Sequence, residues 1–233
     1  MPRGLRLANG ATRERVLRAI ESGPGRVPWD ERSDAFVKTR RRRAGVAAAL
    51  DAALRASRAA RAFEAALVLA RAGVATAEPL ACFDERARSS FVARFVEPRR
   101  ELAFDRDGPD AARLAAKIHE AGVVHGDFKP ANIVVGPRGL VVVDLDAAKV
   151  TKGFPARRAR ARDLGALVAY ASRLGVADTR SLVDAYLAAA PFEEDAESFA
   201  QAVEARSRLK LERWAAASPS PREAGGGPGW GAR

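Results

Sequence analysis

The chain has 233 residues, of which 48% are hydrophobic, so it can build one core of ordinary size or two small lobes that share a cleft. Its single cysteine, Cys82, excludes an internal disulfide and a zinc site built from cysteines. No stretch resembles a membrane span, and the N-terminus lacks the apolar segment of a secretory signal, so we expect a cytoplasmic protein. The net charge of +11 suits an anionic partner, but an arginine-rich composition explains it equally well.

The first part of the chain is expected to form short strands and one long helical segment. Strands are expected at residues 16–20, 35–39, 79–83 and 90–96, with a turn at residues 22–25 (SGPG). Residues 44–72 are nearly all helix formers, and Gly73 suits the end of that segment. These elements predict an N-terminal lobe over residues 14–98.

The second part of the chain is expected to be mostly helical. Helices are expected at about 110–121, 161–174, 179–190 and 193–214. Between the first two of them, the strands 133–135 and 140–143 are joined as a hairpin by the sequence GPRG. The pattern predicts a C-terminal lobe over residues 99–215, followed by a disordered tail over 216–233, which is rich in Pro, Gly and Ser.

The most informative residues lie between positions 124 and 146. The polar loop VHGDFKPAN is followed by the hairpin and then by VDLD. Phosphoryl transfer needs a carboxylate that orients the acceptor hydroxyl, which Asp127 can supply, and a cation near the transferred group, which Lys129 can supply. Asn132 and Asp144 offer the oxygen ligands that magnesium prefers, and the hairpin brings them side by side.

The spacing of these residues matches a kinase signature. Protein kinases carry H-R-D-L-x-x-x-N followed by D-F-G, and this chain carries H-G-D-F-K-P-A-N followed by D-L-D. We therefore predict an ATP- and magnesium-dependent phosphotransferase whose catalytic residues are Asp127 and Lys129. The alternative is that Asp127 and Asn132 only cap turns and that Asp144 only ends a strand.

Over roughly residues 34–170 the sequence resembles the protein-kinase-like superfamily, and within it the bacterial lipopolysaccharide core kinases that phosphorylate heptose or Kdo sugars. The segment EAALVLARAGVATAEPL resembles that family's helix–glycine–strand passage. The sequence from His119 to Asp127 resembles its L-H-x-x-G-x-x-H-x-D run, with Ile118 in place of the leucine. The ending D-L-D and the sequence RDL at 162–164 resemble two further motifs of that family.

This resemblance implies an α+β, bilobal protein-kinase-like fold, with a small antiparallel sheet in the N-lobe and a short helical C-lobe. ATP and Mg²⁺ would lie between the lobes. Lys38 would bind ATP and pair with Glu64, while Asn132, Asp144 and Asp146 would hold nucleotide-bound metal. The acceptor would be a sugar hydroxyl on an anionic glycolipid at the inner face of the cytoplasmic membrane, and no nucleic acid partner is expected.

Some residues near this segment have two readings. Asp146 is either a second metal ligand or a loop acid. The arginine runs at 40–43 and 157–162 either grip an anionic substrate or form solvated surfaces. His119 and His125 suit structural roles around the loop, and in kinase-like folds an acid at the position of Asp163 braces the catalytic loop.

Departures from the kinase pattern keep other functions open. Gly23 and Gly25 do not form a complete glycine-rich loop because Pro28 replaces the third glycine, and Gly126 replaces the catalytic-loop arginine. The rival functions are a small atypical Ser/Thr protein kinase, a phosphotransferase for a soluble small molecule such as an aminoglycoside, and a pseudokinase that binds a partner without turnover. The short C-terminal lobe disfavours the protein kinase, and the basic charge disfavours a cationic acceptor.

Overall fold

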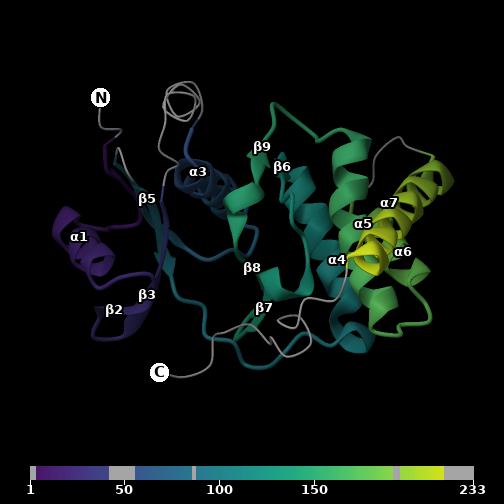
Figure 1. Cartoon of the computed structure of the whole chain (residues 1–233), viewed down its shortest axis with the longest axis horizontal. Coiled ribbons are helices and arrows are strands. Elements are labelled where there is room, and N and C mark those ends of the chain that lie inside the picture. Colours follow the sequence, from purple (N-terminus) through teal and green to yellow (C-terminus); the bar gives the residue numbers. More distant parts are fainter. Residues whose placement is uncertain (1–3, 42–55, 86–87, 191–194, 218–233) are drawn as a thin grey trace.

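The computed structural model describes residues 4–41, 56–85, 88–190 and 195–217. An antiparallel sheet forms one end of the molecule and a group of helices the other, with short hairpins between them (Figure 1). The sheet has the strand order β1-β4-β5-β3-β2. Its strands are β1 (Arg6–Leu7), β2 (Gly25–Asp30), β3 (Ser33–Arg41), β4 (Pro79–Asp84) and β5 (Arg88–Arg94).

The segment expected as the first strand is instead the helix α1 (Arg13–Glu21), so that expectation was wrong. Thr12 caps the helix by accepting a hydrogen bond from the backbone N–H of Arg15. Val16, Ala19 and Ile20, at helical spacing, are buried against the sheet. The apolar positions therefore had period 3.6 within a segment too short to distinguish from a strand.

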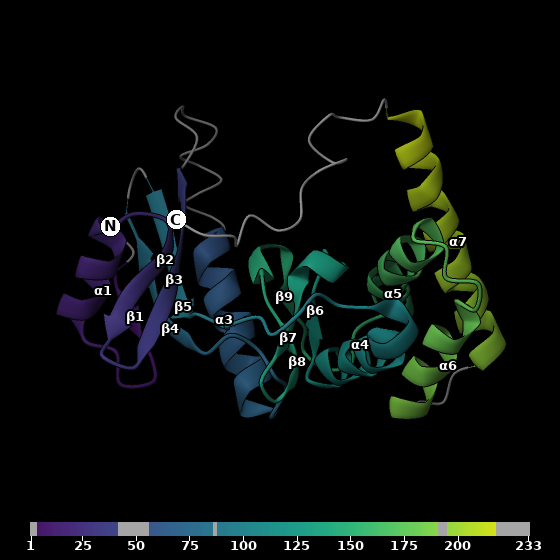
Figure 2. The same ribbon diagram turned by 90° about the horizontal axis from the view of Figure 1, so that it is seen from below.

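The helix α3 (Arg58–Arg71) lies between the sheet and the hairpins, as two perpendicular views agree (Figures 1 and 2). Ser57 caps its first turn, and Ala62, Ala66 and Leu69 are buried beneath it. This helix forms the second half of the long helical segment expected at 44–72; residues 42–55 lie outside the described part of the chain. Gly73 ends the helix at a φ of +71°, as expected.

The remaining elements follow a linker, residues 95–103. The helices are α4 (Phe104–Glu120), α5 (Arg157–Arg173), α6 (Arg180–Ala189) and α7 (Ala196–Ala216). Two short helical turns, η1 (Pro130–Asn132) and η2 (Leu145–Ala147), flank the hairpin of β7 (Ile133–Gly136) and β8 (Gly139–Val142). The two-residue strands β6 (Val123–Val124) and β9 (Lys149–Val150) pair with each other. One continuous apolar core joins α3, α4 and the C-terminal helices.

This architecture confirms the predicted α+β fold with a small antiparallel sheet and a helical second part. The expected hairpin at 133–143 is present, with Ile133 paired to Val142. Helix α4 begins six residues before the expected start, because Asp107 accepts a hydrogen bond from the N–H of Ala103 and holds its first turn. The lobe boundary at 98/99 stays a prediction. Of the tail expected at 216–233, Ala216 still belongs to α7, and residues 218–233 lie outside the described residues.

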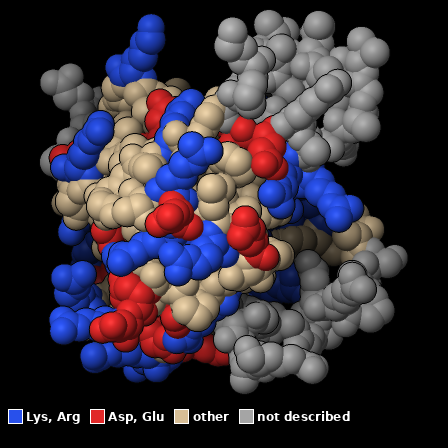
Figure 3. Space-filling model, turned by 90° about the vertical axis from the view of Figure 1, so that its left-hand side faces the viewer, with Lys and Arg blue, Asp and Glu red and all other residues tan. Residues whose placement is uncertain are grey.

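Acidic and basic side chains are mixed over the outer face of the sheet end. Figure 3 looks onto that face and shows both signs interspersed. Ion pairs of the sheet include Arg26 with Asp34 at 2.5 Å and Arg94 with Glu78 at 2.7 Å. Among the described residues, no helix is both long and apolar enough to cross a membrane.

Candidate active site

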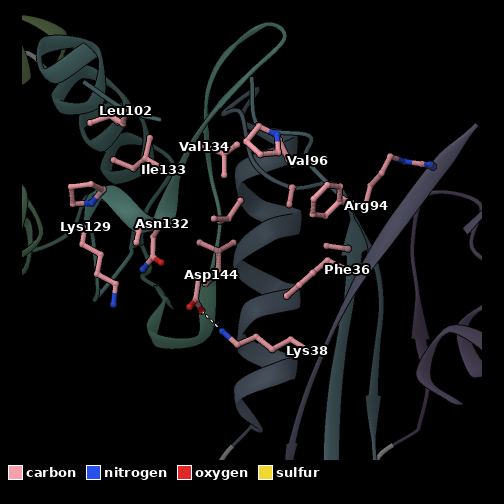
Figure 4. A pocket seen from close by; sticks show the side chains of 18 of the residues that line it. Phe36, Lys38, Arg94, Val96, Leu102, Lys129, Asn132, Ile133, Val134 and Asp144 are labelled. Atoms are coloured by element: carbon pink, nitrogen blue, oxygen red, sulfur yellow. Dashed lines mark hydrogen bonds and ion pairs between the residues drawn. The ribbon is translucent and has the colours of Figure 1, made fainter. Parts of the chain in front are cut away.

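A cavity of about 780 Å³ lies between the sheet and the β7–β8 hairpin. Apolar side chains from both sides line much of it, including Phe36 and Phe91 of the sheet and Ile133 and Leu145 of the hairpin region. At one end the lining becomes polar, where Lys38 faces Asp144 and Asn132 and Lys129 lie nearby (Figure 4). A mostly apolar cleft with a few convergent polar groups suits a nucleotide whose base and phosphates need different surroundings.

The loop that carries Asp127 is held by one buried carboxylate. Asp163 of α5 accepts hydrogen bonds from the backbone N–H of His125 at 2.7 Å and of Gly126 at 2.9 Å. His119 lies 3.4 Å from the same carboxylate through Nε2 and 2.7 Å from the Tyr186 hydroxyl through Nδ1. The prediction that Asp163 braces this loop and that His119 packs beside it is confirmed.

His125 also has the structural role that was expected. Its Nε2 lies 3.1 Å from the carbonyl oxygen of Val143, and its Nδ1 lies 3.3 Å from the backbone nitrogen of Asp127. An acceptor on one side and a donor on the other match a neutral ring protonated at Nε2. Burial lowers the pKa of His125, which keeps the ring neutral and ties the loop to the end of β8.

Asp127 stands at the surface of the loop with two partners. Its carboxylate lies 2.9 Å from Nζ of Lys129, and the side-chain amide of Asn132 donates to its backbone carbonyl at 2.8 Å. Burial alone would raise the pKa of Asp127, but the hydrogen bond and charge of Lys129, with the charge of Lys210, lower it overall. Asp127 is therefore ionised at neutral pH, as a proton acceptor must be.

Asp144 and Asp146 form the opposite wall with cations already between them. Nζ of Lys38 lies 2.5 Å from Asp144 and 3.1 Å from Asp146, and Arg40 lies 3.2 Å from Asp146. Asp144 adopts a left-handed φ of 57°, which aspartate tolerates better than most residues. The ammonium group of Lys38 thus lies between two carboxylates, whose oxygens are the donor atoms that a hard metal cation prefers.

That donor set fits magnesium. The backbone of Val143 donates to the carbonyl of Asn132 at 2.9 Å, so the hairpin brings Asn132 and Asp144 together as predicted. No group of three or more His, Cys, Asp or Glu side chains with metal-site geometry occurs among the described residues. A metal here would therefore take protein ligands from Asn132, Asp144 and Asp146 and its remaining ligands from phosphate and water.

Glu64 does not approach Lys38 in this structure. It lies exposed on α3, and within the described part of the chain it forms no ion pair with Lys38. Lys38 instead pairs with Asp144 and Asp146. The Lys38–Glu64 pair stays a prediction for a nucleotide-bound state, since such helices move when a ligand binds.

The second arginine run does not face the cleft as a group. Arg160 is 2% exposed, donates to the carbonyl of Pro155 and stacks on Phe154, so the expectation that it meets a substrate was wrong. Arg157 bonds to Ser198 at the start of α7. Gly23 lies in the turn before β2 and Gly25 begins that strand, and neither lines a described cavity, which agrees with their incomplete motif.

Sequence reasoning missed two groups near Asp127. Lys210 of α7 lies close enough to lower the pKa of Asp127, with its ammonium over the rings of Tyr170 and Trp214. A smaller cavity of about 280 Å³ beside Asp127 is lined by Arg58 and Arg61 of α3. Both groups come from helices distant in sequence from the loop, and no local motif marks them.

The segment that carries this geometry matches a known protein family. The model of the lipopolysaccharide kinase (Kdo/WaaP) family matches residues 105–186, about a third of the chain, which contains the loop, the hairpin and Asp163. No match was found among the curated proteins. The match confirms, over these residues, the resemblance that the motifs indicated.

Two solved structures give the same fold. WaaP in complex with acyl carrier protein superposes with a TM-score of 0.60 at 20% identity, covering 91% of this chain and 98% of that one. Amicoumacin kinase hAmiN in complex with AMP-PNP, Ca²⁺ and amicoumacin superposes with a TM-score of 0.51 at 12% identity, covering 79% and 81%. Both confirm the protein-kinase-like fold.

Proposed function

We propose that this chain, a kinase-type phosphotransferase by its family match and fold, transfers the γ-phosphoryl group of ATP to a sugar hydroxyl of the lipopolysaccharide core. One observation carries the proposal. Asn132 from the loop, Asp144 from the end of a hairpin and Lys38 from the sheet line one cavity, and Asp127 lines the adjoining cavity, which shares Asp144. Two carboxylates, an amide and an ammonium group that gather at a solvent-accessible cleft indicate a functional site rather than a requirement of folding.

In this proposal the loop supplies the proton acceptor. Asp127, kept ionised by Lys129, orients the acceptor hydroxyl and takes its proton as the new O–P bond forms and the bond to ADP breaks. Lys129 then faces the transferred group, whose charge it offsets. The braces from Asp163 and His125 fix the position of Asp127, which matters because phosphoryl transfer depends mainly on positioning.

The opposite wall binds the nucleotide. Lys38 contacts ATP phosphates, and Asn132, Asp144 and Asp146 hold the metal. A magnesium ion held by these residues would offset the negative charge of the nucleotide phosphates. The apolar part of the cavity, with Phe36 and Phe91, receives the base. We assign no step to Glu64 beyond the predicted pair with Lys38 in the bound state.

The acceptor class rests on the family match, whose described members are lipopolysaccharide kinases. We propose a cytoplasmic protein that meets an anionic glycolipid at the inner face of the membrane, where basic side chains favour the surface. Acyl carrier protein is a further candidate partner, because WaaP, which matches nearly the whole chain, was solved with it. Co-purification of a tagged chain with purified acyl carrier protein tests that association separately.

Parallel radiolabel transfer tests the function. Purified protein, magnesium and γ-labelled ATP are incubated with a lipopolysaccharide core acceptor, a basic protein or an aminoglycoside. We expect the core acceptor to be labelled much faster than the other two. Preferential labelling of protein or aminoglycoside would overturn the sugar acceptor but keep the phosphotransferase; no labelling, with no magnesium-dependent thermal shift by ATP, would favour a pseudokinase.

A further inference from the structure

The smaller cavity, not the nucleotide cavity, reaches Asp127. It is lined by Arg40, Arg58, Arg61, Asp127, Asp144, Asp146 and Ala147 and measures about 280 Å³. The larger cavity shares Asp144 and Asp146 with it but does not include Asp127. Asp127, as the proposed base, must contact the substrate hydroxyl that is phosphorylated. The substrate therefore approaches through the smaller cavity.

Two guanidinium groups in this cavity have no partner among the residues that the structure describes. Arg58 and Arg61 are three positions apart on α3, so they lie on the same face of that helix. Within the described residues, neither side chain forms an ion pair or a hydrogen bond, and Nε of Arg61 is buried without any acceptor. A buried donor without a partner is costly, and a bound ligand is one way to satisfy it.

The acidic side chains of the cavity do not compensate these arginines. Asp127 pairs with Lys129, Asp144 with Lys38, and Asp146 with Lys38 and Arg40. The cavity is therefore divided into an acidic side, whose charges are already paired, and a basic side at the start of α3. A molecule that fills it would place a hydroxyl at Asp127 and a negative group at Arg58 and Arg61.

We propose that Arg58 and Arg61 form an anion subsite that recognises a phosphate or carboxylate on the acceptor, next to the hydroxyl that is phosphorylated. The inference rests on the proposed phosphotransferase function and narrows its acceptor to sugars that already carry a negative group. Arginine suits this task because its planar guanidinium binds carboxylate or phosphate oxygens in pairs. In the sequence, the arginine runs at 40–43 and 157–162 were the candidates for gripping an anionic substrate.

Contacts with ATP explain these arginines less well. Neither Arg58 nor Arg61 lines the larger cavity, which carries Lys38 at its polar end. Arg40 is unsuitable for a test because it bonds to Asp146, so its removal would disturb the metal wall as well. Arg58 and Arg61 can be removed without orphaning any carboxylate among the described residues.

The test compares Arg58→Ala, Arg61→Ala and the double variant with Arg71→Ala, an exposed arginine on the same helix that lines neither cavity. The acceptor is deacylated core oligosaccharide. It is used in three forms: native, with its carboxyl groups reduced, and with its phosphates removed. We expect each cavity variant to raise the KM for native acceptor at least tenfold, with kcat and the KM for ATP changed less than threefold. Arg61→Lys should recover part of the loss, and Arg71→Ala should behave as wild type.

The three acceptor forms identify the negative group. If a carboxylate is recognised, carboxyl reduction raises the wild-type KM as much as Arg61→Ala does and has no further effect in that variant. If a phosphate is recognised, dephosphorylation of the acceptor raises the wild-type KM as much as Arg61→Ala does and has no further effect in that variant. An unchanged acceptor KM in the double variant overturns the subsite, as does an equal rise in the KM for ATP, which would make the arginines nucleotide ligands.

A binding measurement separates this inference from the proposed function. The protein is first saturated with magnesium and a non-hydrolysable ATP analogue, which fills the γ-phosphate position. Inorganic phosphate is then titrated, and the Tm is measured at each concentration. We expect phosphate to raise the Tm of wild type and Arg71→Ala but not of the double variant. If wild type labels no core acceptor yet shows this difference, the proposed acceptor fails and the anion subsite stands; equal shifts in all proteins remove the subsite.

Discussion

The two walls of the cleft are held in different ways. On the helical side, the loop of Asp127 is fixed by buried hydrogen bonds from its own backbone to Asp163 and by the neutral ring of His125. On the sheet side, Lys38 and Arg40 meet Asp144 and Asp146 through ion pairs, and the Asp144 and Arg40 side chains are 38% and 52% exposed. One wall is therefore fixed by buried hydrogen bonds, whereas the other is held by ion pairs that solvent can reach.

The two walls suit two different requirements of phosphoryl transfer. The proton acceptor must stay within a fraction of an ångström of its productive place, which buried backbone hydrogen bonds achieve. The metal wall must exchange one cation for another, and accessible ion pairs are weak enough to allow it. Variants on the two walls should therefore fail in different ways, and the following predictions are ordered by the expected loss.

The largest loss is expected from Asp144→Asn. Asparagine keeps the shape and tolerates the left-handed backbone, but it removes the charge that we propose holds the metal. We expect magnesium-dependent turnover to fall by about 10³-fold or more, since a metal contributes several kcal/mol to such reactions. Circular dichroism should remain that of wild type. Normal turnover in the folded variant would remove Asp144 from the site.

Asp127→Asn should be the next most severe change. Loss of a positioned base lowers kcat by about 10²–10⁴-fold, while the affinity for ATP measured by fluorescence or calorimetry should hardly change. The amide can still accept from Lys129, so the loop should stay in place. If ATP binding were lost to the same extent as turnover, Asp127 would have a structural role rather than a chemical one.

Asp163→Asn tests the rigid wall directly. An amide cannot accept from both backbone N–H groups as well as the buried carboxylate does, so one donor loses its partner. We expect a loss of about 2–3 kcal/mol in the free energy of unfolding, together with a smaller fall in kcat than Asp127→Asn gives. Urea denaturation and steady-state kinetics measure the two effects. Unchanged stability would contradict the brace.

The smallest effect is expected at Asp107, outside the reacting groups. Hydrogen bonds from Arg100 hold the pKa of Asp107 well below its ordinary value of 3.8, and its carboxylate caps the start of α4. We expect Asp107→Asn to cost about 1 kcal/mol, as for a lost helix cap, with turnover nearly unchanged.

The pH dependence of the free energy of unfolding shows whether the ionised carboxylate of Asp107 stabilises the fold. Because the folded pKa is depressed, the stabilisation is present above pH 3.8 and is lost as pH falls from 3.8 toward the folded value. The gap in unfolding free energy between wild type and Asp107→Asn should therefore be constant near neutral pH and shrink below pH 3.8. A gap that widened on acidification would reject the ion pair with Arg100.

The parts that sequence predicted well are local. The loop and the hairpin follow from spacing, because residues a few positions apart and one β-hairpin determine where Asn132 and Asp144 meet. The brace from Asp163, which is distant in sequence, was expected only from the resemblance to kinase-like folds. Contacts between distant helices could not be predicted in this way. Arg58 and Arg61 reach the cavity only because α3 packs against η2, and Lys210 reaches Asp127 from the last helix. The strand at 16–20 failed because five apolar-rich residues do not distinguish the two periodicities.

Gly126 has a consequence for how this chain can change through evolution. It occupies the position of the protein-kinase arginine at a φ of +84°, and a Cβ there would lie 2.6 Å from the carbonyl oxygen of Ala147. No side chain fits without first moving η2, so a single substitution cannot install the arginine that reads a phosphorylated activation loop. A lineage with this backbone therefore cannot gain, by one substitution at this position, a catalytic loop on which a phosphorylated activation loop docks.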